Sequence, residues 1–538
     1  MQDDPLNLAY VLEHAARFHG RVEVVTRRVE DDLVRRSTYA EVLCRTKKLA
    51  HALRKLGVQF GDRVATLAWN TQRHLEAWYA VAGQGAICHT VNPRLFEPQI
   101  EYIVNHAEDK IVLADPCFVP MLERLQSRLP TVQHYVVLTE EAHLPATSLR
   151  KAIAYESLIA DEPEEFCWPS FPESTVSSLC YTSGTTGNPK GVEYTHRSNF
   201  LHALVNNGKD ALGVAASDTL LMVVPMFHAN SWGLAYSCPM VGAKLVLPGA
   251  RLDGKSVYDL LDREQVTMSA GVPTVWNMLL THLREHGLKL PHLREVTIGG
   301  SAAPRSMIES FDREFGVCAV HGWGMTEMSP VGSCCRLRPW MKSLPYEQQL
   351  DVRVKQGTPL FGVSMKTVDA DGQELPHDGK SFGRLLVKGP WIVKRYYKED
   401  HDAVDADGWF DTGDIATIDE HGYMQVTDRA KDLIKSGGEW ISSVELENAA
   451  MGHPQVALVA VIGVFHPKWQ ERPLLIVKPT NGARLTRDAL LDYLANKVVQ
   501  WWLPDDVVFV DDIPLTAAGK LNKRELREQF RDYPLRTA

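Results

Sequence analysis

The sequence predicts an α/β protein: a large N-terminal domain of α/β layers plus a β-rich subdomain, with a small separate C-terminal α/β domain. Three observations lead to this fold class. Strand-like runs alternate with helical patterns up to about residue 320, which is typical of parallel sheets covered by helices. From about residue 355, short strands are separated by D-G and G-x turns, which favour hairpins. The last block, about 432–538, repeats an α/β pattern, and 538 residues are too many for one core.

The alternation begins near the N-terminus, where apolar residues recur at helical spacing in four segments and form compact runs in four others. We expect helices over 8–20, 38–57, 73–85 and 98–108, and strands over 23–28, 62–69, 87–93 and 110–115. The pattern returns later in the chain. There we expect strands over 219–227, 243–249, 294–300 and 318–324, helices over 256–265 and 304–316, and a strand that runs into a helix over 267–283.

The C-terminal third changes in texture. Strand-type runs over 364–375, 383–390 and 422–429, punctuated by D-G and G-x turns, predict the β-rich subdomain. The small domain is expected to contain helices over 443–453 and 487–499 and strands over 456–465, 472–479 and 506–514.

Composition excludes several classes of function. The net charge of −9 provides no field that would favour nucleic acid or an anionic membrane, so we expect no nucleic-acid partner. No apolar run reaches the roughly 18–20 residues that a transmembrane helix needs, and the acidic N-terminus does not resemble a secretory signal. The nine cysteines form no C-x-x-C motif, which fits a reducing compartment, so we expect a cytoplasmic protein. No cluster such as H-E-x-x-H indicates a structural metal.

A loop of small residues, YTSGTTGNPKG at 181–191, stands between two regular elements. It follows the strand-type run 176–181 and precedes a strand-to-helix stretch. Backbone N–H groups in such a loop can close around phosphate oxygens. The spacing differs from G-x-x-x-x-G-K-[ST], so any phosphate is held by a different geometry from that of a Walker A loop. Taken alone, the loop could also be a surface turn or a flexible linker.

The motif GWGMTE, 322–327, carries three useful side chains. The indole of Trp323 offers a stacking face, Thr326 a hydroxyl, and Glu327 a carboxylate for Mg²⁺. The structural alternative is a plain strand-to-helix turn.

Three other stretches add charge or aromatic groups. Asp414 in DGWFDTGD could accept two hydrogen bonds from a ribose diol, and Arg429 in DRAKDLIKSGG could meet sugar or phosphate. Lys520 lies on a turn before a basic helix. His228 and Trp232 lie in an apolar stretch, PMFHANSWGL. For Asp414 and Arg429 the alternatives are D-G turns and a solvated charge run, and for Lys520 an ordinary solvated lysine. His228 and Trp232 could be an ordinary core pair, which composition alone favours.

The order of these motifs, rather than any one of them, resembles the adenylate-forming superfamily, which contains acyl-CoA synthetases, adenylation domains and luciferases. The likeness runs from about residue 8 to 530. The stretches VVPMFHANSW, GGSAAP, GWGMTEMSP and KSGGEWISSVELENA look like the bacterial medium- to long-chain fatty acyl-CoA synthetase branch and its relatives that activate 3-methylmercaptopropionate. The resemblance implies an AMP-forming acid–thiol ligase whose substrates are ATP, a carboxylic acid and coenzyme A, with Mg²⁺ as cofactor.

By matching motif positions, the resemblance assigns roles to single residues. The catalytic group would be Lys520, Glu327 and Thr326, with Glu327 as the magnesium carboxylate. The ATP-binding group would be Thr182, Ser183, Gly184, Thr185, Thr186, Lys190, Gly300, Ser301, Ala302, Trp323, Gly324, Asp414 and Arg429. Lys520 would bridge the substrate carboxylate and the α-phosphate.

The family also implies domain alternation. Residues 1–428 would form the large domain, 429–431 the hinge with Lys431 at its centre, and 432–538 the small mobile domain. After the swing, Gly437, Gly438 and Trp440 would flank the tunnel for the CoA pantetheine. Because long-chain relatives are often homodimers, a homodimer is a further expectation.

The expected acyl pocket consists of His228, Ala229, Trp232, Gly233, Val272 and Pro273. Residues 225–240 contain no Asp or Glu, so a substrate ammonium would lack a counter-ion there. The resemblance favours a medium-chain fatty acid, but a short or sulfur-containing acid stays open, because Trp232 resembles a gate residue that would shorten the pocket when shut. A non-catalytic nucleotide-binding scaffold is the third hypothesis, and Lys520, Glu327 and the loop argue against it.

Three positions depart from the usual pattern. Trp323 stands where the superfamily often has Tyr, and Asp411 where many relatives have a basic or neutral residue. Ala229 stands where most relatives on this branch have Val, which would widen the pocket slightly.

Overall fold

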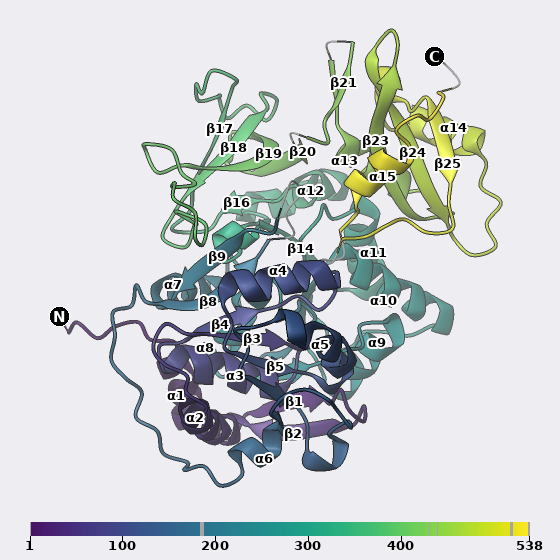
Figure 1. Ribbon diagram of the computed structural model, residues 1–538. Coiled ribbons are helices and arrows are strands. Elements are labelled where there is room, and N and C mark those ends of the chain that lie inside the picture. The colour runs from purple at the N-terminus through teal and green to yellow at the C-terminus, as the bar shows by residue number, and fades with distance from the viewer. Residues whose placement is uncertain (1, 183–187, 430, 438, 517–519, 536–538) are drawn as a thin grey trace.

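The computed structural model describes residues 2–182, 188–429, 431–437, 439–516 and 520–535. It confirms the predicted mixed α/β class. In Figure 1 the purple-to-teal part of the chain forms a large layered body, the green strands β17–β20 stand beside it, and the yellow-green C-terminal elements form a separate sheet with its own helices.

A seven-stranded sheet has the order β7-β6-β5-β3-β4-β8-β9. Its strands pair in parallel except for β8 and β9, which pair antiparallel. The strands are β3 Arg63–Leu67, β4 Ile87–Thr90, β5 Ile111–Ala114, β6 His134–Val137, β7 Ala152–Ala154, β8 Val176–Tyr181 and β9 Gly191–Thr195. This sheet therefore presents the small-residue loop at the β8–β9 connection.

A nine-stranded sheet has the order β16-β15-β14-β13-β12-β10-β11-β1-β2. Its central pairs are parallel, and the strands at the two edges, β2, β15 and β16, are antiparallel. The strands are β1 Glu23–Arg27, β2 Val34–Thr38, β10 Thr219–Leu221, β11 Lys244–Leu247, β12 Met268–Gly271, β13 Glu295–Ile298, β14 Cys318–Gly324, β15 Val331–Cys334 and β16 Thr358–Pro359.

Helices cover both sheets, as the 3.6-residue periodicity predicts. They are α1 Ala9–Phe18, α2 Tyr39–Lys55, α3 Gln72–Gly83, α4 Glu97–Ala107, α5 Val119–Leu125, α6 Tyr155–Ile159, α7 His196–Asn206, α8 Leu234–Val241, α9 Gly254–Arg263, α10 Pro273–His286, α11 Arg305–Phe315 and α12 Tyr346–Arg353. Helix α3 is buried along its whole length and contacts strands of both sheets, so it lies between them. Its start is fixed by Thr71, whose hydroxyl accepts from the backbone N–H of His74.

One expected strand is much shorter than predicted. The run 219–227 is apolar throughout, but β10 ends at Leu221. The side chain of Asn70 donates to the carbonyls of Met222 and Val224 and accepts from the backbone N–H of Met226. Because this amide satisfies the backbone that a neighbouring strand would otherwise pair, the segment leaves the sheet and turns toward residue 228.

The β-rich region is a four-stranded antiparallel sheet in the order β17-β18-β19-β20. Its strands are β17 Ser364–Val368, β18 Gly383–Lys388, β19 Phe410–Ile418 and β20 Met424–Arg429. The register places Asp414 of β19 directly opposite Arg429 of β20. Two residues that are fifteen positions apart in sequence are thus cross-strand neighbours.

The C-terminal sheet is built on a long antiparallel hairpin. The hairpin consists of β23 Val456–His466 and β24 Gln470–Pro479, and β25 Asp506–Phe509 pairs with β24 in parallel. The short strands β21 Ile434–Ser436 and β22 Glu439–Ile441 extend the sheet. Three helices complete this part: α13 Ser443–Met451, α14 Arg487–Ala495 and α15 Lys523–Gln529.

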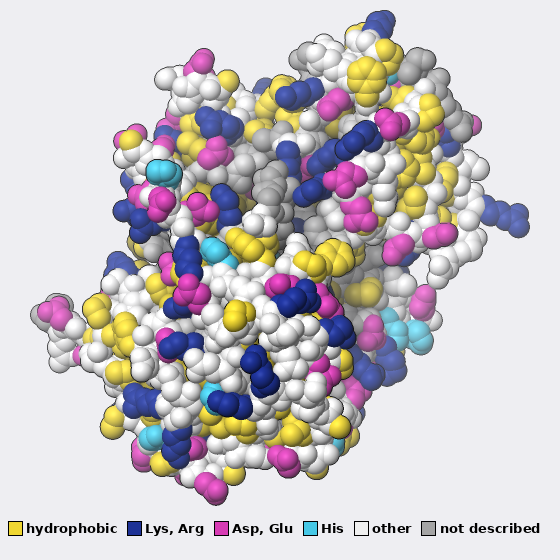
Figure 2. Space-filling view, viewed as in Figure 1, with side chains coloured by type: hydrophobic (Ala, Val, Ile, Leu, Met, Phe, Trp, Pro, Cys, Tyr) yellow, Lys and Arg dark blue, Asp and Glu magenta, His cyan; other side chains and the backbone are white. Residues whose placement is uncertain are grey.

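Surface charge is mixed. In Figure 2, Lys and Arg side chains are interspersed with Asp and Glu over the face in view. None of the helices within the described residues combines the length and the apolarity that crossing a bilayer requires.

Candidate active site

The small-residue loop is anchored at both ends by the β8–β9 pairing. Tyr181 pairs with Gly191 in the ladder, and the backbone N–H of Thr182 donates to the carbonyl of Lys190 at 2.8 Å. The predicted positions Ser183, Gly184, Thr185 and Thr186 lie outside the described residues. The described ends nevertheless show that the loop is a strand-to-strand connection.

Lys190 is connected to Glu327 through an aromatic side chain. The ammonium of Lys190 lies 4.8 Å from the ring centroid of Tyr396, within cation–π range. The hydroxyl of Tyr396 donates to Oε1 of Glu327 at 2.9 Å. Tyr396 therefore joins two predicted phosphate- and magnesium-binding residues, and it was absent from the predicted set.

The backbone around Glu327 is held on two sides. The backbone N–H of Val393 donates to the carbonyl of Glu327 at 2.7 Å. The hydroxyl of Tyr194, on β9, donates to the carbonyl of Thr326 at 2.7 Å. The motif is therefore attached both to the loop's own strand and to the segment that carries Tyr396.

Trp323, Asp414 and Arg429 form a hydrogen-bonded row. The indole Nε1–H of Trp323 donates to Oδ2 of Asp414 at 2.9 Å, and Nε of Arg429 lies 2.6 Å from Oδ1. Asp414 is only 2% exposed, so its carboxylate is fixed by both contacts. Gly324 next to Trp323 admits no side chain, because a Cβ there would lie 2.0 Å from the carbonyl oxygen of Pro330.

Three predicted site residues converge on Gly300. A Cβ built at this position would lie 3.0 Å from Cγ1 of Val272 and 3.9 Å from both Cε of Lys520 and Cζ2 of Trp232. The φ of +80° at Gly300 also suits glycine. The C-terminal lysine, the expected acyl wall and the GGSAAP segment are therefore brought together in one place.

Ser301 and Ala302 continue this segment, with Ser301 exposed and Ala302 partly buried. Pro273 begins α10 directly after Val272. Proline is favoured at the first helical position because its missing N–H needs no partner there.

The Lys520 ammonium is partly buried among charged groups. Burial is the main cause that lowers the pKa of Lys520 to about 8, and the Arg429 guanidinium lowers it further. The carboxylates of Asp414 and Glu327 act against this decrease in pKa. Two anionic and one cationic predicted residues are thus close enough to Lys520 to affect its titration.

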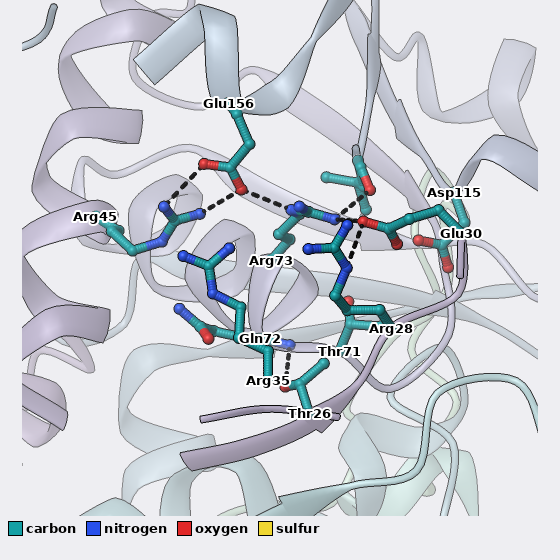
Figure 3. A pocket seen from close by; sticks show the side chains of 11 residues that line it. Thr26, Arg28, Glu30, Arg35, Arg45, Thr71, Gln72, Arg73, Asp115 and Glu156 are labelled. Carbon is teal, nitrogen blue, oxygen red and sulfur yellow. Dashed lines mark hydrogen bonds and ion pairs between the residues drawn. The ribbon is translucent and has the colours of Figure 1, made fainter. Parts of the chain in front are cut away.

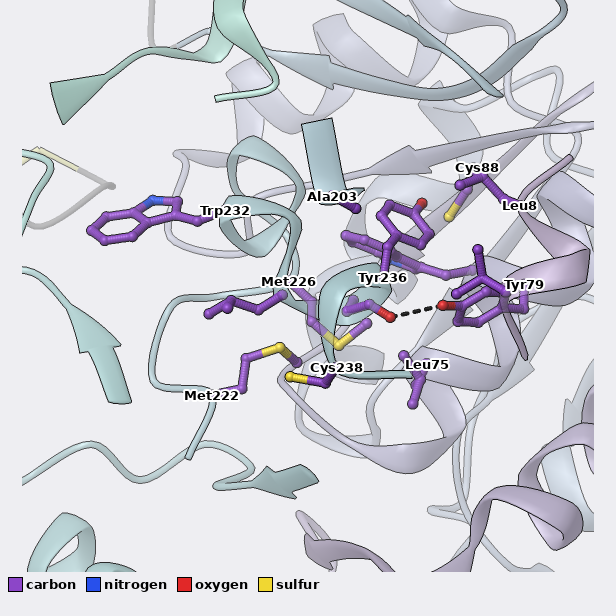
Figure 4. Packing of buried hydrophobic residues seen from close by; sticks show 14 of the residues in the cluster. Leu8, Leu75, Tyr79, Cys88, Ala203, Met222, Met226, Trp232, Tyr236 and Cys238 are labelled. Atoms are coloured by element: carbon purple, nitrogen blue, oxygen red, sulfur yellow. Dashed lines mark hydrogen bonds between the residues drawn. The ribbon is translucent and has the colours of Figure 1, made fainter. Parts of the chain in front are cut away.

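The acyl side of the site contains an unusual backbone. Residues Ala229–Gly233 all have positive φ, from 43° at Ala229 to 76° at Gly233, although only the last is glycine. Left-handed conformations are unfavourable for residues with a Cβ. The turn points the Trp232 indole at Gly299 and Gly300, and a Cβ on Gly299 would lie 2.8 Å from the ring. Figure 4 shows this indole apart from the core residues Met222, Met226 and Tyr236.

Buried amides hold this left-handed turn. Asn230 donates to Asn199 at 2.8 Å, and Asn199 donates to the hydroxyls of Ser177 and Ser178 on β8. Asn206 donates to the carbonyl of Trp232 at 2.8 Å. The turn is therefore tied to the strand that leads into the small-residue loop.

His228 precedes the turn and is neutral at pH 7. Burial lowers its pKa to about 4, and the positive charges of Lys520 and Arg94 lower it further. Arg94 itself lies over the rings of Trp69 and Phe227, at 5.6 and 5.8 Å from their centroids. Arg94 is a cation beside the acyl wall that sequence reasoning missed.

Comparisons with known proteins agree with this geometry. The AMP-binding enzyme model matches residues 11–397, and the AMP-binding enzyme C-terminal domain model matches residues 445–520. The chain belongs to the AMP-binding enzyme family. The chain is 47% identical to a 3-methylmercaptopropionyl-CoA ligase of Ruegeria lacuscaerulensis, covering 99% of this chain and 98% of that protein. It is equally 47% identical to a medium-chain-fatty-acid–CoA ligase of Ectopseudomonas oleovorans, covering 100% and 98%.

A solved structure supports the fold. The anthranilate CoA ligase AuaEII, in complex with anthranoyl-AMP, superposes with a TM-score of 0.87 at 26% identity, covering 98% of this chain and 99% of that one. The predicted fold class, superfamily and enzyme class are confirmed. The chain is an AMP-forming acyl-CoA ligase.

Two of the predicted CoA-tunnel residues of the ligase, Gly437 and Trp440, make contacts within the C-terminal part. The backbone N–H of Gly437 donates to the carbonyl of Trp469, and Trp440 lies under the ammonium of Lys435, all in the C-terminal part. Gly438 lies outside the described residues. Lys431 is exposed, between Arg429 and the rest of the C-terminal sheet.

The unexpected Asp411 of the ligase has a local role. Its Oδ2 pairs with Arg384 on the neighbouring strand at 2.7 Å, and its Oδ1 accepts from the backbone N–H of Gly413 at 2.9 Å. Asp411 therefore pairs β19 with β18 and holds the backbone of β19 just before Asp414.

A second charged cluster of the ligase lies around a small cavity between α3, β1 and β6. Arg45 and Arg73 both bind Glu156, and Arg28 and Arg73 share Glu30 (Figure 3). Since these arginines are paired with carboxylates, the cluster joins the two sheets.

Proposed function

We propose that this ligase activates a medium-chain fatty acid. The observation that carries the proposal is the convergence of Lys520, Val272 and Trp232 on Gly300, because it joins a cation to an apolar wall. A substrate carboxylate beside Lys520 would place its alkyl chain against apolar side chains. Each buried CH₂ contributes about 0.8 kcal/mol, so a pocket of this kind favours longer acids.

The chemistry proceeds in two half-reactions. A carboxylate oxygen attacks the α-phosphorus of ATP, the bond to the bridging oxygen breaks, and pyrophosphate leaves with the electron pair. The sulfur of CoA then loses its proton and attacks the acyl carbon, and AMP leaves. The first step brings an anion to a polyanion, so positioning and charge stabilisation dominate the catalysis.

Single residues take roles that suit this problem. Lys520 neutralises the carboxylate and the α-phosphate as they meet. Arg429 supports the α-phosphate and Asp414 accepts from the ribose, while the Trp323 indole stacks on adenine. Thr182, Lys190 and Thr326 bind the phosphates.

Glu327 is the candidate for Mg²⁺. The residue is 9% exposed, its carboxylate accepts from the hydroxyl of Tyr396, and it lies near Lys520. Among the described residues no group of three or more His, Cys, Asp or Glu side chains could hold a metal ion. This fits Mg²⁺, which often takes one protein carboxylate together with substrate phosphates. When bound, the ion would neutralise phosphate charge.

Domain alternation is part of the proposal. The large domain comprises 1–428, the hinge 429–431 and the mobile small domain 432–538. Rotation at Lys431 would withdraw Lys520 and bring Gly437, Gly438 and Trp440 to the acyl carbonyl. A homodimer and a cytoplasmic location stay predictions.

A short or sulfur-containing acid, such as 3-methylmercaptopropionate, is the second candidate. The observation that favours it is the Trp232 ring, which lies against Gly299 and would end the pocket early. The Ruegeria relative has this acid in its name. A medium-chain acid therefore requires the indole to move.

A CoA-dependent AMP-release assay over straight acids from C3 to C16, with 3-methylmercaptopropionate included, tests both candidates. We expect kcat/KM to rise with chain length up to medium-chain acids. A maximum at the shortest acids or at the thioether would replace the first candidate with the second. No AMP release with any acid would support a non-catalytic scaffold.

A further inference from the structure

A buried cluster of charged groups lies three residues beyond Lys520. The ammonium of Lys523, at the start of α15, lies 2.8 Å from Oε1 of Glu447 and donates to Oγ of Ser443 at 2.6 Å. Both partners belong to α13. Lys523 and Glu447 are each 9% exposed and Ser443 is fully buried. The helix that follows the catalytic lysine is thus fixed to α13.

Asp428 extends this cluster across the hinge. It is the residue before the proposed hinge segment and lies on β20, in the large domain. Its Oδ2 accepts from both the backbone N–H and the hydroxyl of Ser443, at 2.6 and 2.7 Å. Its Oδ1 accepts from the backbone N–H of Arg429. A single carboxylate therefore holds the first hinge residue and the N-terminus of α13 together.

The segment around Lys520 is connected to α15, the helix that begins at Lys523. The backbone N–H of Thr516 donates to the carbonyl of Lys520, and the backbone N–H of Asn522 donates to the carbonyl of Pro514 at 2.9 Å. The side chain of Asn522 also caps α15. Because Lys520 stands two residues before this cap and its carbonyl is bonded to Thr516, the position of α15 determines where Lys520 lies.

A second contact from α15 reaches the other side of the hinge. Arg527 binds Oδ1 of Asp432 at 2.6 Å. Since α15 is attached both before the hinge, through Ser443 and Asp428, and after it, through Asp432, its place relative to the large domain is defined.

We propose that Lys523 and Asp428 are positioning residues that hold Lys520 in the adenylate-forming site, through the bridge Lys523–Ser443–Asp428 across the hinge. The inference rests on the proposed function, in which Lys520 serves adenylation alone. Rotation at Lys431 separates Ser443 from Asp428, so the bridge belongs to the adenylating arrangement. The thioester-forming arrangement does not use it.

The test compares the two half-reactions in the full-length protein. Adenylate formation is followed by pyrophosphate–ATP exchange, and thioester formation by CoA consumption from supplied acyl-adenylate. Lys523→Met is expected to slow adenylate formation about 100-fold, the loss that a displacement of about 1 Å can cause, and to change thioester formation less than about threefold. Lys523→Arg should restore most of the rate, since it keeps the charge.

Asp428→Asn provides a milder variant with the same expected split, because it weakens the link to Ser443 without removing volume. Arg524→Met is the matched control. Arg524 is adjacent to Lys523 but pairs on the surface with Glu528, so its loss should leave both half-reactions unchanged. Thermal unfolding of each variant separates loss of folding from loss of positioning.

The outcomes separate a failure of this inference from a failure of the proposed function of Lys520. If Lys520→Ala loses adenylation but Lys523→Met and Asp428→Asn lower both half-reactions equally, or behave like Arg524→Met, the bridge has no positioning role. If Lys520→Ala keeps normal adenylation, the proposed function of Lys520 is wrong.

Discussion

The titration of Lys520 provides a direct test of the proposed chemistry. Burial and the Arg429 guanidinium together lower the pKa of this lysine to about 8 in the free enzyme. For a lysine, the charged form is present below the pKa and is lost as the pH rises through it. Adenylate formation, which needs the cation, should therefore fail on the alkaline side.

The size of the effect follows from the pKa. At pH 9 only about one-tenth of the enzyme would keep a charged Lys520, so kcat/KM for ATP should fall about tenfold for each further pH unit. Bound ATP brings anions that favour the ammonium. The alkaline decline in kcat should therefore lie at higher pH than the decline in kcat/KM.

The assay is pyrophosphate–ATP exchange between pH 6.5 and 9.5 at saturating Mg²⁺. In Lys520→Arg the guanidinium stays charged over this range, so whatever activity remains should show no alkaline decline. Thioester formation from supplied acyl-adenylate should not decline either, since it does not use Lys520. An alkaline decline of equal size in Lys520→Arg, or none in the wild type, would refute the assignment.

Three further predictions concern single side chains. Trp232→Ala should extend the range of acids toward longer chains, measured as the ratio of kcat/KM for C12 and C4 acids; an unchanged ratio would exclude the indole as the end of the pocket. Trp323→Phe keeps a stacking ring but removes the hydrogen bond to Asp414. Since one such bond contributes roughly 1 kcal/mol, KM for ATP should rise about fivefold in steady-state assays. Tyr396→Phe removes the hydroxyl that holds Glu327, and a titration should show that more Mg²⁺ is needed for half-maximal rate; Tyr397→Phe is its control.

Much of the fold was predictable because the local signals agree with the tertiary structure. The alternation of strand and helix patterns over 62–115 corresponds to β3, α3, β4, α4 and β5. The apolar residues that recur at a period of 2 in strands and of 3.6 in helices are the residues that the folded protein buries, so the local pattern and the tertiary structure agree. The strand predicted over 219–227 is wrong for 222–227, because the side-chain amide of a distant residue, Asn70, makes the backbone hydrogen bonds that a neighbouring strand would make.

The site was predictable only in part. The order of motifs identified Trp323, Asp414, Arg429 and Lys520, and the structure brings these residues together. Their roles came from resemblance and not from spacing, because no local rule connects residue 414 with residue 520.

Contacts between segments that lie far apart in the chain could not be predicted from the sequence. Tyr396 meets Glu327 across 69 positions, and Lys523 meets Ser443 across 80. Neither pair has a periodic or motif signal. Side chains that orient other side chains become visible only when the chain is folded.

The left-handed turn at Ala229–Gly233 limits how new substrate preferences can arise. Four of its five positions carry a Cβ in a conformation that β-branched residues tolerate especially poorly. Valine or isoleucine in place of the tryptophan would therefore disturb the main chain as well as the cavity. Variation that preserves folding is more readily accommodated on the opposite wall, at Val272, where the backbone is ordinary and a shorter or longer side chain alters only the room left for the acid.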